Sequence, residues 1–208
     1  MPRVSIVILS HRPELMPEAF RSVVNQTYKD REIVVKFFDG EWWPEKLNEA
    51  IRGTSGEQFA VLCDDDSLAP TWLARCVEAM DFERTPIAYT DNQVFGLMDM
   101  RYALPDFSRD ILALHCVPHF TALTSRQLWE NVGGYDGTQQ HVDWDFWATC
   151  AEHGATAAHV REHLFGYRVT HTNSSRAFND ADAMALLRRK HPWIAATVER
   201  VKIPLAAA

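Results

Sequence analysis

The feature that most constrains the fold is an apolar run that ends in three consecutive carboxylates. Residues 59–63 contain no polar interruption, which is typical of a strand buried on both faces of a parallel sheet. Asp64, Asp65 and Asp66 follow directly, and Pro70 then favours the start of a helix. Because adjacent like charges raise one another's pKa, a divalent cation with oxygen ligands is an economical way to hold them there. The open alternative is capping of a helix N-terminus, with Asp66 or Ser67 as the candidate.

Strands and helices alternate through the first 80 residues. Besides the acidic strand, the pattern predicts strands at 4–9 and 32–38 and helices at 17–26, 44–51 and 70–80. Strand–helix–strand units form parallel sheets with right-handed crossovers, and ligands bind outside the carboxyl ends of such strands. We therefore expect the acidic run to lie near two other strand ends, which carry Ser10, His11, Arg12 and Asp39.

The second half of the chain predicts a different organisation, without an internal repeat or a clear linker. We expect a hairpin turned at Gly96, a loop over 105–110 and a final helix at 179–190 that Pro192 breaks. The other expected elements are strands at 119–123, 155–160 and 164–169, and helices at 125–132 and 142–153, each ended by glycine.

Composition limits the classes of function. A chain of 208 residues that is 47% hydrophobic can bury the core of one domain. Its 28 acidic against 21 basic residues, a net charge of −7, argue against binding to nucleic-acid phosphates. No apolar run is long enough for a membrane span or a signal peptide. The cysteines are too widely spaced for a zinc or redox motif, which favours reduced thiols in a cytoplasmic protein.

Several stretches, in order from residue 4 to residue 176, together resemble the family 2 glycosyltransferases. The opening strand and helix and the acidic run, as the family's DxD motif, carry the first half of the resemblance. The later motifs are His115-Cys116-Val117-Pro118-His119, Gly133-Gly134-Tyr135-Asp136, Asp143-Trp144-Asp145-Phe146-Trp147 and Tyr167-Arg168-Val169. The resemblance implies an α/β GT-A fold, a Rossmann-like and mostly parallel sheet flanked by helices, with a smaller antiparallel acceptor-side portion. Within one domain, residues 1–95 would bind the nucleotide sugar, 96–178 the acceptor, and 179–208 would form a helical tail.

The resemblance also implies an inverting, hexosyltransferase-like activity. A sugar would pass from a nucleoside-diphosphate sugar to an acceptor hydroxyl, with Mn²⁺ or Mg²⁺ neutralising the departing diphosphate. Asp64 would approach the ribose, Asp65 or Asp66 would hold the metal, and His171 would complete the metal site. The alternative for His171 is an ordinary surface histidine.

Residues at the other strand ends would bind the donor base. Asp39 would accept a hydrogen bond from N3–H of a uracil or thymine ring, so a UDP- or dTDP-sugar is expected rather than a GDP-sugar. Ser10 and Arg12 would line the nucleotide pocket. The alternatives are that Asp39 is a turn residue before Gly40 and that Arg12 is a solvated loop charge.

On the acceptor side, Asp143 matches the family's general base, although Val142 stands where relatives usually have Glu. Its alternative role is to stabilise the first turn of a helix. His119 would lie where the sugar and the acceptor meet. Trp42 and Trp43 are the candidates for stacking on a sugar, and the i,i+3 pair of tryptophans in the 142–153 helix is expected in the core.

Two other functions remain open from the sequence. A nucleotidyltransferase also needs metal-binding acids, but the segment after the first strand, residues 10–14, lacks the glycines of a phosphate-binding loop. A non-catalytic module that binds a nucleotide sugar or a glycan is the second. The acceptor is expected to be a glycan, a protein or a small molecule, and the short chain to act as a minimal enzyme or through self-association.

Overall fold

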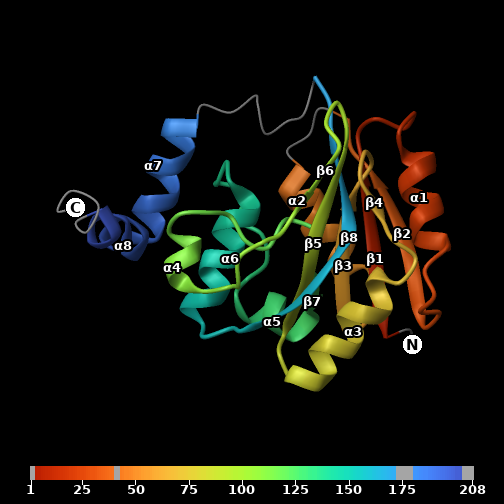
Figure 1. Cartoon of the computed structure of the whole chain (residues 1–208), viewed down its shortest axis with the longest axis horizontal. Helices are drawn as coiled ribbons and strands as arrows, with labels where there is room; N and C mark the ends of the chain where they lie inside the picture. The colour runs from red at the N-terminus through yellow and green to blue at the C-terminus, as the bar shows by residue number, and fades with distance from the viewer. Residues whose placement is uncertain (1–2, 40–42, 172–179, 203–208) are drawn as a thin grey trace.

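The computed structural model describes residues 3–39, 43–171 and 180–202. They form a mixed α/β fold in which one curled sheet of eight strands is flanked by helices (Figure 1). The strands run in the order β2-β1-β3-β7-β5-β8-β4, and β6 pairs with β5 outside that path. They are β1 Val4–Ser10, β2 Arg31–Phe37, β3 Gln58–Cys63, β4 Ser67–Leu68, β5 Ile87–Gly96, β6 Met100–Tyr102, β7 Leu123–Ser125 and β8 Ala157–Val169.

The predicted parallel arrangement of the first three strands is confirmed. β1 lies between β2 and β3 and runs parallel to both. Ser10 pairs with Phe37 and Leu9 with Cys63, so the three strands end at the same level of the sheet. β7 is antiparallel to β3 and β5, whereas β5 and β8 are parallel. The carboxyl end of β3, with its acidic run, therefore lies beside the carboxyl end of β1.

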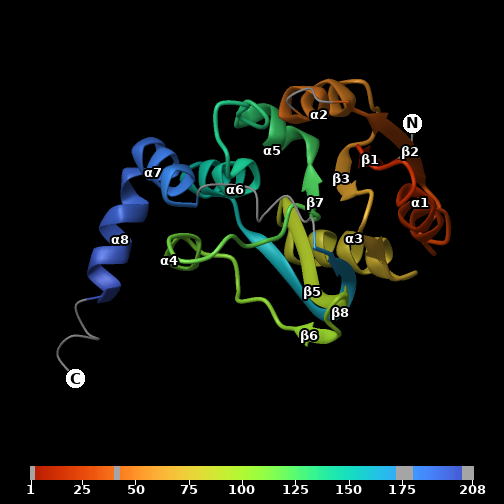
Figure 2. The same ribbon diagram turned by 90° about the horizontal axis from the view of Figure 1, so that it is seen from above.

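Helices cover both faces of the sheet (Figure 2). α1 and α3 pack on one face, and α2, α5 and α6 on the other. The helices are α1 Met16–Val24, α2 Trp43–Arg52, α3 Trp72–Glu83, α4 Arg109–Leu112, α5 Arg126–Asn131, α6 Val142–Glu152, α7 Asp180–Lys190 and α8 Pro192–Lys202.

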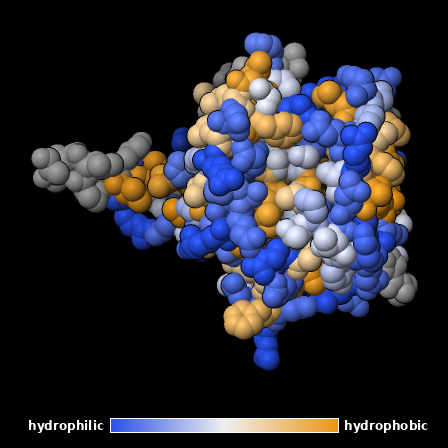
Figure 3. Space-filling model, turned by 45° about the vertical axis from the view of Figure 1, so that its right-hand side comes forward, coloured by the Kyte–Doolittle hydropathy of each residue, from blue (hydrophilic) through white to orange (hydrophobic). Residues whose placement is uncertain are grey.

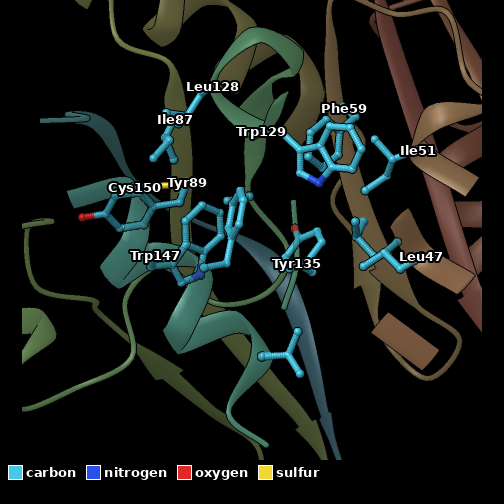
Figure 4. Packing of buried hydrophobic residues seen from close by; sticks show 14 of the residues in the cluster. Leu47, Ile51, Phe59, Ile87, Tyr89, Leu128, Trp129, Tyr135, Trp147 and Cys150 are labelled. Carbon is cyan, nitrogen blue, oxygen red and sulfur yellow. The ribbon is translucent and has the colours of Figure 1, made fainter. Parts of the chain in front are cut away.

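The alternation of side chains along β3 explains its continuous apolar sequence. Phe59 and Val61 enter the core beneath α2, α5 and α6, whereas Ala60 and Leu62 enter the core beneath α1 and α3. Phe59 meets the indole of Trp129 edge-on, with ring centroids 6.1 Å apart (Figure 4). A strand buried on both faces leaves no position for a polar residue until it ends.

Three expectations about the second half are wrong in detail. The segment 119–123 is mostly loop, and β7 begins only at Leu123. The strands expected at 155–160 and 164–169 are one long strand, β8, which changes register with β5 around Asp91. Pro192 does not end the helical tail, because it opens α8, where a proline at the first position loses no helical hydrogen bond.

The acidic strand is also followed by an element that the pattern did not predict. Before the helix begins, Ser67 and Leu68 form the short strand β4, antiparallel to β8. Helix α3 starts two residues after Pro70. The alternative in which Asp66 or Ser67 caps a helix N-terminus is therefore not what the structure shows.

The C-terminal helices α7 and α8 lie to one side of the sheet, next to α4 and α6 (Figure 1). A small core of Ala113, Ala148, Leu187 and Ile194 joins them to those two helices. On the face shown in Figure 3, hydrophilic residues predominate and hydrophobic ones are scattered among them. None of the described helices combines the length and the apolar character needed to cross a membrane.

Candidate functional site

A cavity of about 490 Å³ opens at the carboxyl ends of β1 and β3. Acids reach it from two elements, the run after β3 and the first turn of α6. Its polar lining residues are His11, Arg12, Asp64, Asp65, Asp66, His119, Thr121, Gln140, His141 and Asp143. Most of the remaining wall is apolar or aromatic, and such a lining with a few convergent polar groups is typical of a ligand site.

Asp64 is 1% exposed, and its carboxylate organises the loop after β1. Its Oδ2 accepts hydrogen bonds from Ser10 Oγ at 3.1 Å, from His11 N at 2.9 Å and from Arg12 N at 2.7 Å. Its Oδ1 accepts from Arg12 Nη2 at 2.9 Å. Three of these four donors share Oδ2, so Oδ1, which accepts only from Arg12 among these contacts, is the oxygen that a ribose hydroxyl would reach.

Arg12 lies between two of the acids. The same Nη2 that contacts Asp64 lies 2.7 Å from Asp65 Oδ2. Arg12 Nε is buried and has no hydrogen-bond partner among the described residues. The guanidinium therefore neutralises part of the acidic run and is more than a solvated loop charge.

Asp66 faces the opposite strand. Its Oδ1 accepts from the backbone N–H of Arg168 at 2.9 Å, and Arg168 Nε donates to the carbonyl of Asp65 at 2.8 Å. Burial, followed by the neighbouring charge of Asp65, raises the pKa of Asp66 well above its usual value. With all three acids ionised, the run would carry more negative charge than its arginine partners offset.

That excess charge and the oxygen donors fit a divalent cation. Mg²⁺ and Mn²⁺ are commonly held by one or two carboxylates, with water and substrate phosphates completing the coordination. Asp65 and Asp66 would supply those carboxylates. Among the residues that the structure describes, no group of three His, Cys, Asp or Glu side chains is arranged to hold a metal. His171 is exposed just beyond β8 and does not line the cavity.

Asp143 lies in the first turn of α6 and lines the same cavity as the acidic run. Its Oδ1 accepts from the backbone N–H of Trp144 at 2.9 Å, which stabilises the start of the helix. Its charge also acts on buried neighbours: after burial itself, Asp143 is the main cause of the raised pKa of the Cys116 thiol. Cys116 therefore stays a neutral thiol beside this carboxylate.

His119 lines the cavity beside these groups. Its imidazole stacks on Tyr167, with ring centroids 5.5 Å apart, and lies 5.8 Å from the ring of Phe165. Burial lowers the pKa of His119, and Asp143 offsets this only in part. A neutral imidazole can donate or accept a hydrogen bond without adding charge to the site.

Not all of the residues expected to bind the nucleobase or the sugar of the donor line the cavity. Ser10 is fully buried and bonded to Asp64, and does not itself line the cavity. Asp39, just past β2, is exposed, and its neighbour Phe38 lines the cavity and lies 5.2 Å from the ring of His11. Trp43 lines the cavity in edge-on contact with Phe120, with ring centroids 5.4 Å apart.

Trp42, the other tryptophan considered for sugar stacking, is outside the described residues. The two tryptophans of α6 differ. Trp147 is fully buried in the core as expected, whereas Trp144 is partly exposed and lines the cavity.

Sequence reasoning also missed Arg168 and Phe120 as parts of the site. Arg168 stood in a recognised motif, but its contacts with the acidic run depend on the pairing of β4 with β8. The sequence predicts that Phe120 lies in a strand, whereas the structure has a loop at this position.

Comparison with solved structures shows the fold. Residues 1–349 of S. aureus TarS in complex with UDP-GlcNAc match 94% of this chain at 12% identity, with a TM-score of 0.74. The same fragment in complex with UDP matches 81% of this chain, which spans only 61% of the fragment, at 10% identity and a TM-score of 0.67.

The mannosyltransferase PcManGT from Pyrobaculum calidifontis, in complex with GDP-Man and Mn²⁺, matches the whole chain and is covered to 76%. Its identity is 16% and its TM-score 0.62. No protein-family profile and no curated protein sequence matches the chain. The expected GT-A fold, with a mostly parallel sheet flanked by helices, is thus confirmed at the level of structure.

Proposed function

We propose that this chain is an inverting glycosyltransferase, which moves a sugar from a nucleoside-diphosphate sugar to an acceptor hydroxyl. One observation carries the proposal: the acidic run after β3 and Asp143 of α6 line one cavity. The chemistry needs a cation-binding group at the diphosphate and a separate base at the acceptor. The structural neighbours in complex with UDP, UDP-GlcNAc and GDP-Man support this class of donor.

In this proposal Asp143 takes the proton from the acceptor hydroxyl as its oxygen attacks the anomeric carbon. The bond from that carbon to the diphosphate oxygen breaks, and the configuration inverts. A divalent cation bound by Asp65 and Asp66 would stabilise the charge of the departing diphosphate. The guanidinium of Arg12 lies 2.7 Å from Asp65, and its positive charge would also stabilise the negative charge of the departing diphosphate. His119 positions the groups where the sugar and the acceptor meet.

At the base end, we propose that Asp39 accepts from N3–H of a uracil or thymine ring that packs against Phe38. Phe38 lines the cavity and Asp39 follows it directly, which supports this placement. A guanine ring would present N1–H and an amino group on a larger bicyclic ring, so for a site that holds the smaller ring a UDP- or dTDP-sugar is the proposed donor. Ser10 contributes through its hydrogen bond to Asp64, which fixes the loop beside the nucleotide. His171 lies just beyond β8 and outside the cavity, so in this proposal it completes the metal site only when that segment moves toward Asp65 and Asp66.

The experiment has two stages. A thermal-shift panel of nucleoside diphosphates and nucleotide sugars, with and without Mn²⁺, identifies the donor, because a ligand that binds the native state raises its stability. Donor turnover is then compared between the wild type and Asp143→Asn. We expect metal-dependent shifts for a uridine or thymidine nucleotide and a turnover loss of about 10²–10⁴-fold in the variant.

Asp30→Asn is the matched control, because Asp30 is exposed and lies outside the cavity. It should retain wild-type turnover. Turnover that survives Asp143→Asn would remove Asp143 as the base. Nucleotide binding without turnover would favour a non-catalytic module, and transfer of a nucleotidyl group would favour a nucleotidyltransferase.

A further inference from the structure

A second cavity, of about 290 Å³, adjoins the proposed donor site. Cys116, His119 and Trp144 line both cavities. Trp144 follows Asp143 directly in the first turn of α6. The second cavity therefore extends the site on the side of the proposed base.

Buried polar contacts, none of which the proposed reaction uses, hold one wall of this second cavity. The backbone N–H of Leu104 donates to Asp91 Oδ1 at 2.9 Å, and the hydroxyl of Tyr89 donates to the carbonyl of Pro105 at 2.8 Å. The imidazole of His159 stacks on Tyr89 and lies 2.8 Å from Asp91 Oδ1. Residues 104 and 105 are thereby bonded directly to β5, and His159 links these β5 residues to β8.

A second set of contacts holds the opposite wall. The indole Nε1 of Trp144 donates to the carbonyl of Leu112 at 2.6 Å, which ties α4 to α6. The hydroxyl of Ser108 accepts from the N–H of Ile111 at 3.2 Å and caps α4. Because both walls are held within the protein itself, a ligand would not have to order them on binding.

The lining differs from that of the donor cavity in its lack of formal charge, although His115 and His119 give it polar edges beside its apolar side chains. The described residues of this lining include no Asp, Glu, Lys or Arg, so the second cavity does not suit a diphosphate. Leu104 and Val117 form a buried apolar part, and Tyr102 and Leu114, which are 47% and 40% exposed, stand nearer the solvent. An apolar group can pack against these side chains.

We propose that the second cavity binds an apolar group, aryl or alkyl, of the acceptor, whose hydroxyl is presented to Asp143. This inference rests on the proposed function and names the acceptor class: a hydroxyl compound with a hydrophobic substituent. Ligand cavities typically measure about 300–1,000 Å³, so this one is large enough for a substituent but small for a second nucleotide sugar. The donor remains in the larger cavity.

The test compares matched acceptors with the full chain, Mn²⁺ and the donor identified above. Each of several monosaccharides is assayed beside its phenyl and its octyl β-glycoside. Burial of an aryl or alkyl group should lower KM by about tenfold or more relative to the free sugar. The phenyl and octyl arms show which kind of group the cavity prefers.

Leu114→Glu places a charge in the second cavity and should abolish the preference for the glycosides. Leu97→Glu is the matched control, because Leu97 is 51% exposed and lines neither cavity. It should keep the preference. If Leu114→Glu does not fold, Tyr102→Ser removes part of the same wall from an exposed position.

Equal use of free sugars and glycosides, or equal losses in Leu114→Glu and Leu97→Glu, would overturn the proposal. If no nucleotide binds and no donor is consumed, the proposed function fails separately. Saturation-transfer NMR with phenyl and octyl β-glucoside then still tests the cavity. Contact to the phenyl or octyl group that Leu114→Glu removes supports it, and the absence of that contact in the wild type overturns it.

Discussion

Arg12 places one guanidinium against two buried carboxylates, those of Asp64 and Asp65. Removing one partner of a buried charge pair leaves the other uncompensated. We therefore expect Arg12→Gln to lower the free energy of unfolding by about 2–4 kcal/mol in urea titrations. Mn²⁺ without nucleotide should raise the melting temperature more in Arg12→Gln than in the wild type, because a cation can replace the lost guanidinium.

Arg75→Gln is the control for this prediction. Arg75 pairs with Glu78 and Glu162 on the surface, where solvent screens the charges and such pairs contribute little to stability. A loss in Arg12→Gln no larger than in Arg75→Gln would mean that the acidic run does not depend on Arg12.

Asp39 is an exposed carboxylate beside the cavity-lining Phe38, so its substitution should not disturb the core. If it accepts from N3–H of the donor base, Asp39→Ala loses a charge-assisted hydrogen bond, which contributes about 1.5–3 kcal/mol. Calorimetric titration should then show UDP or dTDP binding weakened by about tenfold or more, with GDP binding unchanged. Equal weakening of all three would show that Asp39 does not read the base.

At the scale of elements, Gly56 sets how closely the loop before β3 approaches β1. A Cβ on Gly56 would lie 2.5 Å from Ser5 Oγ, 2.6 Å from Ser5 N and 2.8 Å from the carbonyl of Gln58. Two of these atoms are backbone, so the strands would have to move. We expect Gly56→Ala to destabilise the fold by about 1–3 kcal/mol in chemical denaturation.

Gly53→Ala is the matched substitution three residues earlier. The nearest atom to its added Cβ would be the Ala50 carbonyl oxygen at 3.4 Å, an ordinary contact. It should be neutral or slightly stabilising, because alanine restricts the unfolded chain. Similar losses in both variants would contradict the close-approach argument.

The elements also show where sequence patterns are reliable. Apart from the two-residue β4, the strands and helices of the first half follow from the sequence, because each has a clear period and most are bounded by a glycine, a proline or an acid. The segment 119–123 was mistaken for a strand because a short apolar run cannot show whether a neighbouring strand is available to pair with it. The sequence predicts two strands in place of β8, because charged and polar residues at 161–163 interrupt the apolar pattern. The register of β8 with β5 shifts at the same place.

At the scale of the whole molecule, a charged cluster joins the C-terminal helices to α6. Lys190 Nζ lies 2.8 Å from both Asp136 Oδ2 and Asp145 Oδ2. His191 is 1% exposed, and its two ring nitrogens lie 2.9 Å from Asp145 Oδ1 and from Glu152 Oε1. An imidazole between two carboxylates donates from both nitrogens only when it is protonated.

This cluster predicts a pH dependence of stability. Burial alone would lower the pKa of His191, but the hydrogen bonds and charges of Asp145 and Glu152 outweigh it and raise that pKa. The stabilisation is complete below the unfolded pKa of about 6.5 and is lost as the pH rises through the raised folded value. The free energy of unfolding should therefore fall more steeply above pH 6.5 in the wild type than in His191→Gln.

Other groups of the cluster act at different pH. Burial alone would raise the pKa of Asp136, but the hydrogen bonds from Lys190 and Thr138 and the charge of Lys190 together lower it to about 2. The contribution of Asp136 is therefore lost only as the pH falls from about 4 toward 2. The neighbouring Trp193 donates to Glu152 Oε1 at 2.6 Å and does not titrate. His153→Gln, at an exposed histidine of the same region, is the control and should keep the wild-type slope. Identical slopes in all three proteins would show that His191 does not titrate as inferred.

The sequence by itself determined the alternation of strands and helices, the parallel sheet and the position of the acidic run at a strand end. These features follow from local periodicity, because a strand that is buried on both faces has apolar side chains at consecutive positions. Only the tertiary structure decided that Asp64 accepts hydrogen bonds from Ser10 and from the loop after β1, that Arg12 bridges two acids and that Asp143 shares their cavity. Each of those facts depends on hydrogen bonds or packing between residues more than 50 positions apart, for which local sequence carries no signal.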